Sequence, residues 1–308
     1  MGRAAPFILA VATALLGFAE PESAWQPSGP DFPFFPAYFQ PSNPPRLWVF
    51  PPDELKAPVT LPEGLPRNLR GVAFGDDGGA LYLQTVNFLD RAAGIYKVQF
   101  RPPRRSLVPG SIGVGELWCL SVSRATGVMT VSGMSWALNR SGVFQIDPRT
   151  AASHALPTGS PTTCGGSGGV MSPDGGRAIV TDGKRLGLEA MKTGEISPIK
   201  GARADAQSVW SPDGRWVVIV RGGTATLVDA VDVTQSRRLG SLGSGPLVWS
   251  PDSRYLLRRR SGLSCGFGNE GESLEVVDVA TAERREVTSS HCVVMGGTFG
   301  WLDRSLAH

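Results

Sequence analysis

Two short stretches of the chain match the Gly-x-Ser-x-Gly pattern that surrounds the nucleophilic serine of many hydrolases. They are Gly165–Gly169, centred on Ser167, and Gly262–Gly266, centred on Ser264. In such enzymes the serine lies on a sharp turn between a strand and a helix, beside a base and an acid. Neither stretch is followed by a helical pattern. We therefore expect both to be glycine-rich loops next to strands, and we predict no catalytic residue in them.

Histidine and cysteine, which often carry catalytic and metal chemistry, are scarce. The sequence has three histidines, His154, His291 and His308, which are far apart. His291 precedes Cys292, and such a neighbour could activate a thiolate unless a disulfide engages the sulfur. The four cysteines contain no Cys-x-x-Cys pair, so a zinc site has little support. We expect no metal site and no cofactor.

Charged residues give two further patterns. The acids Asp77, Asp174, Asp213 and Asp252 recur at turn positions, and we interpret them as turn residues because catalytic carboxylates would not follow a structural period. The densest basic cluster is Arg258–Arg260. Side chains alternate between the two faces of a strand, so we expect this cluster to lie on a solvated edge rather than to form an anion site.

One repeated hairpin organises the segments that carry these residues. Its copies begin at Ser172, Ser211 and Ser250, which are 39 positions apart, and read Ser-Pro-Asp-Gly, Ser-Pro-Asp-Gly and Ser-Pro-Asp-Ser. Proline presets the backbone for a turn, aspartate bonds its own backbone, and glycine accepts positive φ. The apolar run at 216–220 that follows is typical of a buried strand. A fixed period near 40 residues indicates a repeat architecture.

Weaker copies extend the repeat in both directions. Six hairpins are centred on Asp77, Ala125, Asp174, Asp213, Asp252 and Asp303. Further strands follow most of them and no amphipathic helix is evident, so we predict an all-β fold, a six-bladed β-propeller of four-stranded blades. Seven blades remain the alternative, because the longer hairpin separations could contain irregular strands. We expect the last blade to be closed by N-terminal strands near 46–50 and 57–61.

The hairpins that follow Trp210 and Trp249 resemble the repeat of TolB-like propellers, which are related to the WD-type (WD40-like, PD40-like) repeats. The resemblance is good over 165–288, weaker over 70–157 and absent before Arg46. It implies a bacterial periplasmic or secreted setting and a role in protein–protein contact within the cell envelope. The motif is informative about fold and nearly silent on activity.

The cysteines Cys119, Cys164, Cys265 and Cys292 are candidate disulfide partners if the protein is exported. In a four-stranded blade, the link leading into the innermost strand and the link between the second and third strands lie on one face. We expect Cys119 and Cys164 to lie on this face in adjacent blades, and Cys265 and Cys292 likewise. These two disulfide pairings are therefore favoured. Four cysteines allow three connectivities, and the other two stay open.

The N-terminus has the pattern of a signal peptide over residues 1–19. Arg3 precedes a short apolar run at 6–16 and small residues at 17–19, and the run is too short to span a bilayer. We expect cleavage after Ala19 or, alternatively, after Ala24, while an uncleaved membrane anchor remains the other interpretation. Residues 20–45 are rich in proline and aromatic side chains, which predicts an extended linker or a docking segment before a propeller at 46–308. No membrane span is expected after signal cleavage.

The 308 residues carry a formal net charge of +3, which gives no strong signal for binding polyanions, so nucleic acid is not an expected partner.

We predict a secreted or periplasmic, non-enzymatic propeller that binds a protein, peptide or glycan partner in the cell envelope. The alternative is a propeller enzyme, a hydrolase or lyase, with its site at the channel mouth. A diverged propeller that has lost the function of its repeats is a third hypothesis. The irregular loops at 159–169 and 261–272 are where we expect the binding function.

Overall fold

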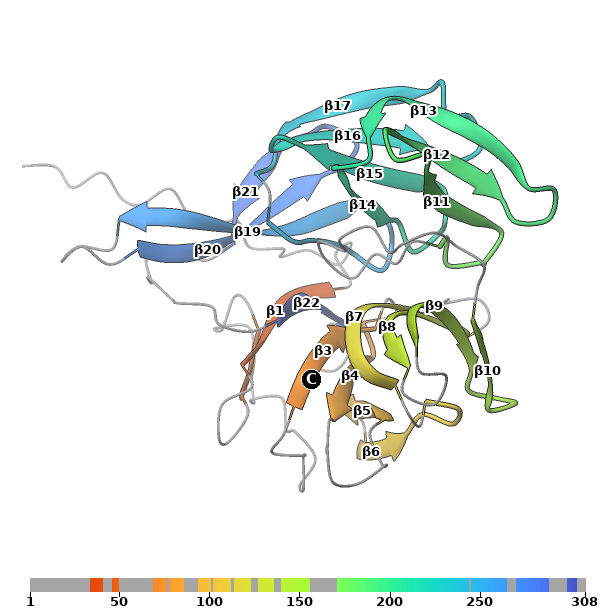
Figure 1. Ribbon diagram of the computed structural model, residues 1–308. Coiled ribbons are helices and arrows are strands. Elements are labelled where there is room, and N and C mark those ends of the chain that lie inside the picture. Colours follow the sequence, from red (N-terminus) through yellow and green to blue (C-terminus); the bar gives the residue numbers. More distant parts are fainter. Residues whose placement is uncertain are drawn as a thin grey trace, which may run out of the picture.

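The computed structural model describes residues 34–40, 46–49, 69–75, 78–85, 94–100, 102–111, 114–122, 127–135, 140–155, 171–243, 245–264, 270–287 and 298–303. Within these ranges the chain forms β-strands joined by turns, and the predicted all-β class is confirmed (Figure 1). No helix in this part of the chain has the length and apolarity that crossing a membrane requires.

The described strands form six antiparallel sheets, and four of these contain four strands, each paired with the next along the chain. The first sheet contains β3 (Leu69–Phe74), β4 (Ala80–Thr85), β5 (Gly94–Phe100) and β6 (Pro103–Leu107). The second contains β7 (Val114–Val122), β8 (Met129–Ser135), β9 (Arg140–Asp147) and β10 (Ala152–Ala155). The fourth contains β14 (Gln207–Trp210), β15 (Trp216–Arg221), β16 (Thr224–Asp229) and β17 (Ser236–Ser241). The fifth contains β18 (Leu247–Trp249), β19 (Tyr255–Ser264), β20 (Glu270–Asp278) and β21 (Arg284–Glu286).

The third sheet follows the same plan with a shortened first strand. It contains β11 (Arg177–Thr181), β12 (Arg185–Ala190) and β13 (Glu195–Arg203). Ahead of them, Met171 forms an isolated antiparallel bridge with Ala178. The same spacing joins Trp210 to Val217 in the fourth sheet, so Met171 occupies the position of a first strand.

The sixth sheet joins the two ends of the described chain and corrects one prediction. Strand β22 (Thr298–Asp303) pairs with β1 (Phe34–Gln40), and β1 pairs with β2 (Arg46–Val49) (Figure 1). Part of the expected linker at 20–45 is therefore a strand. It lies in the middle of its sheet although it contains Pro36, because burying Phe34, Pro36 and Ala37 outweighs one missing backbone donor. The strand expected near 57–61 lies outside the described residues.

The hydrophobic core lies between neighbouring sheets rather than within a single layer. In β15, Val217 and Ile219 pack into the cluster shared with the third sheet. Val218 and Val220 point the other way, into the cluster shared with the fifth sheet. Because both faces of this strand are covered, its sequence is a continuous apolar run instead of an alternation of apolar and polar residues.

The first strands of successive sheets also lie next to one another. Strand β3 contacts β7, β14 contacts β18, and β22 contacts both β18 and β3. These contacts connect the last described strand of the chain with the first four-stranded sheet. Such a succession of first strands is what a propeller requires around its axis.

Candidate functional site

The turns of the sheets gather at two opposite faces of the molecule. On one face the hairpins after the first strands meet, and the Asp213 N–H donates to Ser253 Oγ of the next sheet at 3.2 Å. On the other face, the turn between the second and third strands meets the link to the following sheet. There the N–H groups of Leu242 and Gly243 donate to the carbonyl oxygen of Gly223 at 2.7 and 3.0 Å. We call the first the hairpin face and the second, marked by Gly223 and Gly243, the link face.

The repeated aspartates stabilise the turns of the hairpin face. Ser211 Oγ donates to Asp213 Oδ1 at 2.5 Å and accepts from the Trp216 N–H at 2.9 Å. Equivalent bonds form at Ser172 and at Ser250. The interpretation of these acids as turn residues is confirmed for the three clear copies of the motif.

In the first copy the hydrogen bonds also change the acidity of the carboxyl group. Burial raises the pKa of Asp174, but hydrogen bonds from Ser172 Oγ and the Gly176 N–H outweigh this effect. The pKa therefore lies below the ordinary value of 3.8. At neutral pH the group is a carboxylate that accepts bonds from the turn, and it is unsuited to act as a general acid.

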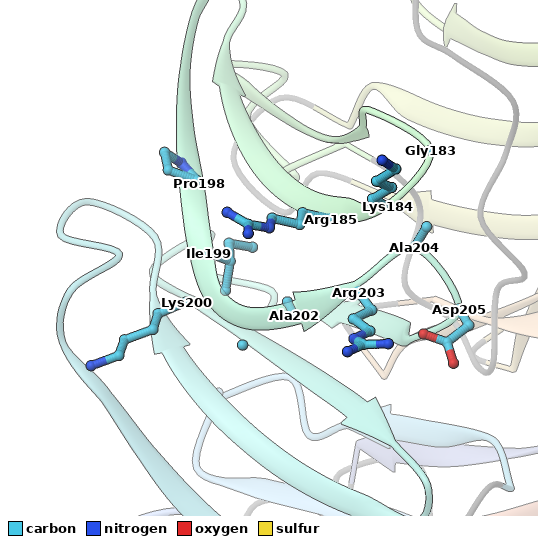
Figure 2. A pocket seen from close by; sticks show the side chains of 11 residues that line it. Gly183, Lys184, Arg185, Pro198, Ile199, Lys200, Ala202, Arg203, Ala204 and Asp205 are labelled. Atoms are coloured by element: carbon cyan, nitrogen blue, oxygen red, sulfur yellow. The ribbon is translucent and has the colours of Figure 1, made fainter.

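A hollow of about 990 Å³ opens on the link face beside β12 and β13, and we call it the Lys184 hollow (Figure 2). Its lining comes from the turn before β12, the end of β13 and the link that follows. The lining residues are Gly183, Lys184, Arg185, Pro198, Ile199, Lys200, Gly201, Ala202, Arg203, Ala204 and Asp205. The Ala204 N–H donates to the Lys184 carbonyl oxygen at 3.2 Å and so holds the link against the turn.

The hollow results from a bulge in β13. Arg185 is the register partner of Arg203, whereas Gly187, two positions further along β12, is the partner of Pro198, five positions back along β13. The extra residues of β13 have no partner on β12 and must leave the plane of the sheet. Among them Gly201 has φ of 76°, a conformation that glycine adopts without steric cost.

Some side chains of the bulge are buried in the core and others are exposed to solvent. Ile199 and Ala202 pack into the core between the third and fourth sheets and are 3% and 6% exposed. Lys200 and Gly201 lie between them and are exposed. Because its two apolar members anchor the bulge, it presents Lys200 from a fixed piece of backbone.

The Lys184 hollow is lined mainly by cations. Lys184, Arg185, Lys200 and Arg203 are all exposed. Among the described lining residues the single acid is Asp205, and it forms an ion pair with Arg221 at 3.3 Å. An excess of positive charge in a concave surface favours ligands that carry negative charge.

Asp182 holds the backbone of the turn that carries two of these cations. Its Oδ1 accepts the N–H groups of Lys184 at 2.8 Å and of Arg185 at 2.7 Å. These backbone hydrogen bonds, from Arg185 first and then Lys184, lower the pKa of Asp182 below 3.8. The carboxylate thus stays ionised and keeps the turn ordered at neutral pH.

The structure corrects the prediction for the basic cluster Arg258–Arg260. Arg258 is 9% exposed and its Nε donates to Glu275 Oε2, so it is a buried ion-paired residue and not part of a solvated edge. Strand β20 lies beside β19 in the same sheet, and sequence alone could not place its Glu275 opposite Arg258. Arg260 is exposed, as expected.

The remaining candidate residues are only partly described. Cys119 lies in β7 as the register partner of Ser132, while Cys164, Cys265 and Cys292 lie outside the described residues. The proposed disulfides therefore remain predictions. The segments 1–33 and 159–169 lie outside as well, as do Gly165–Gly169, Asp77, His291 and His308.

Two candidates can be placed. Ser264 lies in β19 opposite Glu270 and thus in a strand, not at a turn from a strand into a helix. His154 is exposed in β10, opposite Gln145. Among the described residues, no three His, Cys, Asp or Glu side chains are grouped so that they could hold a metal ion.

The sequence did not single out the cations of the Lys184 hollow. They lie in two separate segments, 184–185 and 200–203, and only the pairing of β12 with β13 brings Arg185 to Arg203. One signal was present. Gly201 and Gly240 are 39 positions apart and both have positive φ, so the repeat itself marks the end of the fourth strand as the place of a bulge.

The similarity of this chain to known proteins lies in its fold. No family model matches the sequence, and neither does any curated protein. The fold is similar to TolB from Acinetobacter baumannii, with a TM-score of 0.56 and 16% identity over 87% of this chain and 66% of that chain. This chain thus spans about two thirds of the length of that TolB.

Two other solved structures are also similar. A putative TolB from Agrobacterium tumefaciens has a TM-score of 0.52 and 13% identity over 83% of this chain and 88% of that one. A chain of a nidogen/laminin complex has a TM-score of 0.52 and 10% identity over 88% of this chain and 97% of that one. These likenesses to β-propeller proteins show that the chain has a β-propeller fold.

Proposed function

We propose that this chain is an exported, non-enzymatic propeller of six blades that binds a partner protein through its link face. The observation that carries the proposal is the Lys184 hollow, a large concave surface on the link face with four exposed cations and a single paired acid. Such a positively charged lining can bind a negatively charged surface of another protein. A hydrolase or lyase would instead need converging acids or histidines to transfer protons.

The architecture supports a rigid scaffold. The described strands form six sheets, and the sixth unites β1 and β2 with β22. We infer that this sheet is a blade that closes the ring, so that the N-terminal and C-terminal strands hold each other. The hairpin repeat belongs, on this proposal, with the TolB-like PD40 repeats.

Three solved structures with the same fold support the proposals of a binding role and of an envelope location. One is a nidogen/laminin complex, in which a similar chain is part of a protein–protein assembly. The others are TolB proteins, and their likeness supports the proposal that this chain is periplasmic or secreted. The N-terminal signal pattern agrees with export, and N-terminal sequencing of the purified mature protein tests cleavage after Ala19 or Ala24.

The test of the function is affinity purification from the native cell envelope with the wild-type chain and two variants. The Lys200→Glu/Arg203→Glu variant reverses two charges of the Lys184 hollow. The control Lys192→Glu/Arg254→Glu reverses two exposed charges at turns of the hairpin face. We expect one stoichiometric partner with the wild type and the control, and at least a tenfold loss with the hollow variant. Equal recovery with both variants would contradict binding at this hollow.

A further inference from the structure

A second hollow, of about 570 Å³, lies on the link face between the fourth and fifth sheets. It is lined by Ser241, Leu242, Gly243, Gly245, Arg258, Arg259, Arg260, Glu275 and Arg284. The residues come from the link after β17 and from three strands of the fifth sheet. We call it the arginine hollow, since four of its side chains are guanidinium groups.

One carboxylate already occupies part of this hollow. Glu275 accepts a hydrogen bond from Arg258 Nε, and the two side chains are only 12% and 11% exposed. A carboxylate is therefore held here, away from bulk water, by one edge of a guanidinium group. This pair neutralises Arg258 and shows which chemistry the hollow accommodates.

The remaining positive charge belongs chiefly to Arg260 and Arg284. Arg284 donates from Nη2 to the Leu239 carbonyl oxygen at 3.3 Å, a neutral acceptor, and it forms no ion pair with an acid in the part of the chain that the structure describes. Arg260 is exposed at the register position opposite Ser273. Guanidinium groups recognise carboxylates through paired, parallel hydrogen bonds, so these two arginines can each receive an anionic group from solution.

Two glycines lie next to these arginine side chains. A Cβ atom on Gly240 would lie 2.6 Å from Arg284 Nη2, and one on Gly243 would lie 3.6 Å from Arg258 Nη1. Both glycines have positive φ, 94° and 71°. Arg284 thus lies across the end of β17, with its Nη2 beside Gly240.

The volume indicates more than one carboxylate. Ligand pockets commonly enclose about 300–1,000 Å³, and the arginine hollow falls in this range. A single carboxylate would fill only a small part of it. Several acidic side chains spaced along a short extended peptide would match both its size and its separated arginines.

We propose that the arginine hollow binds carboxylate side chains from an acidic peptide segment. Placing that segment on a partner protein rests on the proposed function, whereas the affinity of the hollow for carboxylates does not. Arg260 and Arg284 receive the incoming carboxylates, and the Arg258–Glu275 pair forms the floor that keeps the site in shape.

The experiment is calorimetric titration of the purified full chain with an acetylated and amidated hexaglutamate peptide at low salt. The Arg260→Gln/Arg284→Gln variant is expected to bind at least tenfold more weakly than the wild type. The control Arg254→Gln removes an arginine on the hairpin face of the same sheet and is expected to change the affinity less than twofold. Hexaglutamine, which has the same length and no charge, is expected not to bind.

Three results would overturn the proposal. The first is that the double variant binds hexaglutamate with the same affinity as the Arg254→Gln control. The second is that hexaglutamine binds the wild type as tightly as hexaglutamate does. The third is that inorganic phosphate binds the wild type more tightly than hexaglutamate does. If the Arg284 change impairs folding, Arg260→Gln alone provides the test, because this side chain is exposed. If the wild-type chain captures no partner but still binds the peptide through Arg260, the proposed function is rejected and this inference stands.

Discussion

Trp249 Nε1 donates a hydrogen bond to the carbonyl oxygen of Val209 at 3.3 Å, joining the first strands of two neighbouring sheets. In the same way, Trp301 Nε1 donates a hydrogen bond to the carbonyl oxygen of Val248 at 3.2 Å. Trp249 is the last residue of β18, Trp301 lies within β22, and each is almost fully buried. In these two sheets a single tryptophan thus connects its sheet to the preceding one through both packing and a hydrogen bond.

Replacing Trp249 with phenylalanine should weaken the junction between the fourth and fifth sheets. The loss of the Val209 hydrogen bond and of buried volume should lower the free energy of unfolding by about 1–3 kcal/mol. Chemical denaturation measures the change. The control is Trp216→Phe, a half-buried ring that stacks on Arg215. If Trp249→Phe lowers the free energy of unfolding no more than Trp216→Phe does, Trp249 does not hold the two sheets together.

Replacing Ser211 with alanine should destabilise one hairpin. The change leaves the Trp216 N–H and Asp213 without the hydroxyl that joins them, and an unsatisfied group costs about 1–2 kcal/mol. Ser236→Ala, on the exposed outer strand β17, should change stability by less than about 0.5 kcal/mol. Similar unfolding midpoints for both variants would contradict the prediction.

Asp174 should make stability depend on pH under acidic conditions. Its folded-state pKa lies below the ordinary 3.8, so its contribution is present above that value and disappears as the pH falls through the folded-state pKa. The wild type should therefore lose stability more steeply than Asp174→Asn between about pH 5 and pH 3. Unfolding curves across this range measure the slopes. Asp205→Asn, in an exposed ion pair, controls for the loss of one negative charge.

The buried pair of Arg258 and Glu275 should show strong coupling. Arg258→Met leaves a nearly buried carboxylate without its partner and should cost about 3 kcal/mol. In Arg258→Met/Glu275→Leu no charge remains, so most of that loss should be recovered. A double-mutant cycle by denaturation provides the measurement. Additive effects of the two single changes would show that the pair is not coupled.

Gly201 should be required for the bulge that forms the Lys184 hollow. A Cβ atom there meets nothing within 4 Å, but φ is 76°, so alanine is strained by the backbone alone and should cost about 1 kcal/mol. The matched control is Gly142→Ala, whose Cβ atom would meet only Phe144 at 3.9 Å and whose φ is not positive. Equal tolerance of alanine at both sites would refute the requirement.

Local chemistry made much of the fold predictable. The Ser-Pro-Asp turns and the apolar strands after them depend on residues within six positions of one another, as the bonds around Ser211 show. Repetition at 39 residues then indicated the propeller. Strand β1 and its pairing with β22 were not predicted, because Pro36 argues against a central strand when read locally, and the closing strands were expected near 46–50 and 57–61 instead.

The sequence by itself determined the hairpins, the all-β class and the structural role of the repeated aspartates, because neighbours along the chain decide turn geometry. The two basic hollows were decided by tertiary structure. Arg185 meets Arg203 through a bulge in β13, and Arg258 is buried because β20 brings Glu275 opposite it. Such contacts depend on the register between strands, and the register is set by packing of whole sheets against each other.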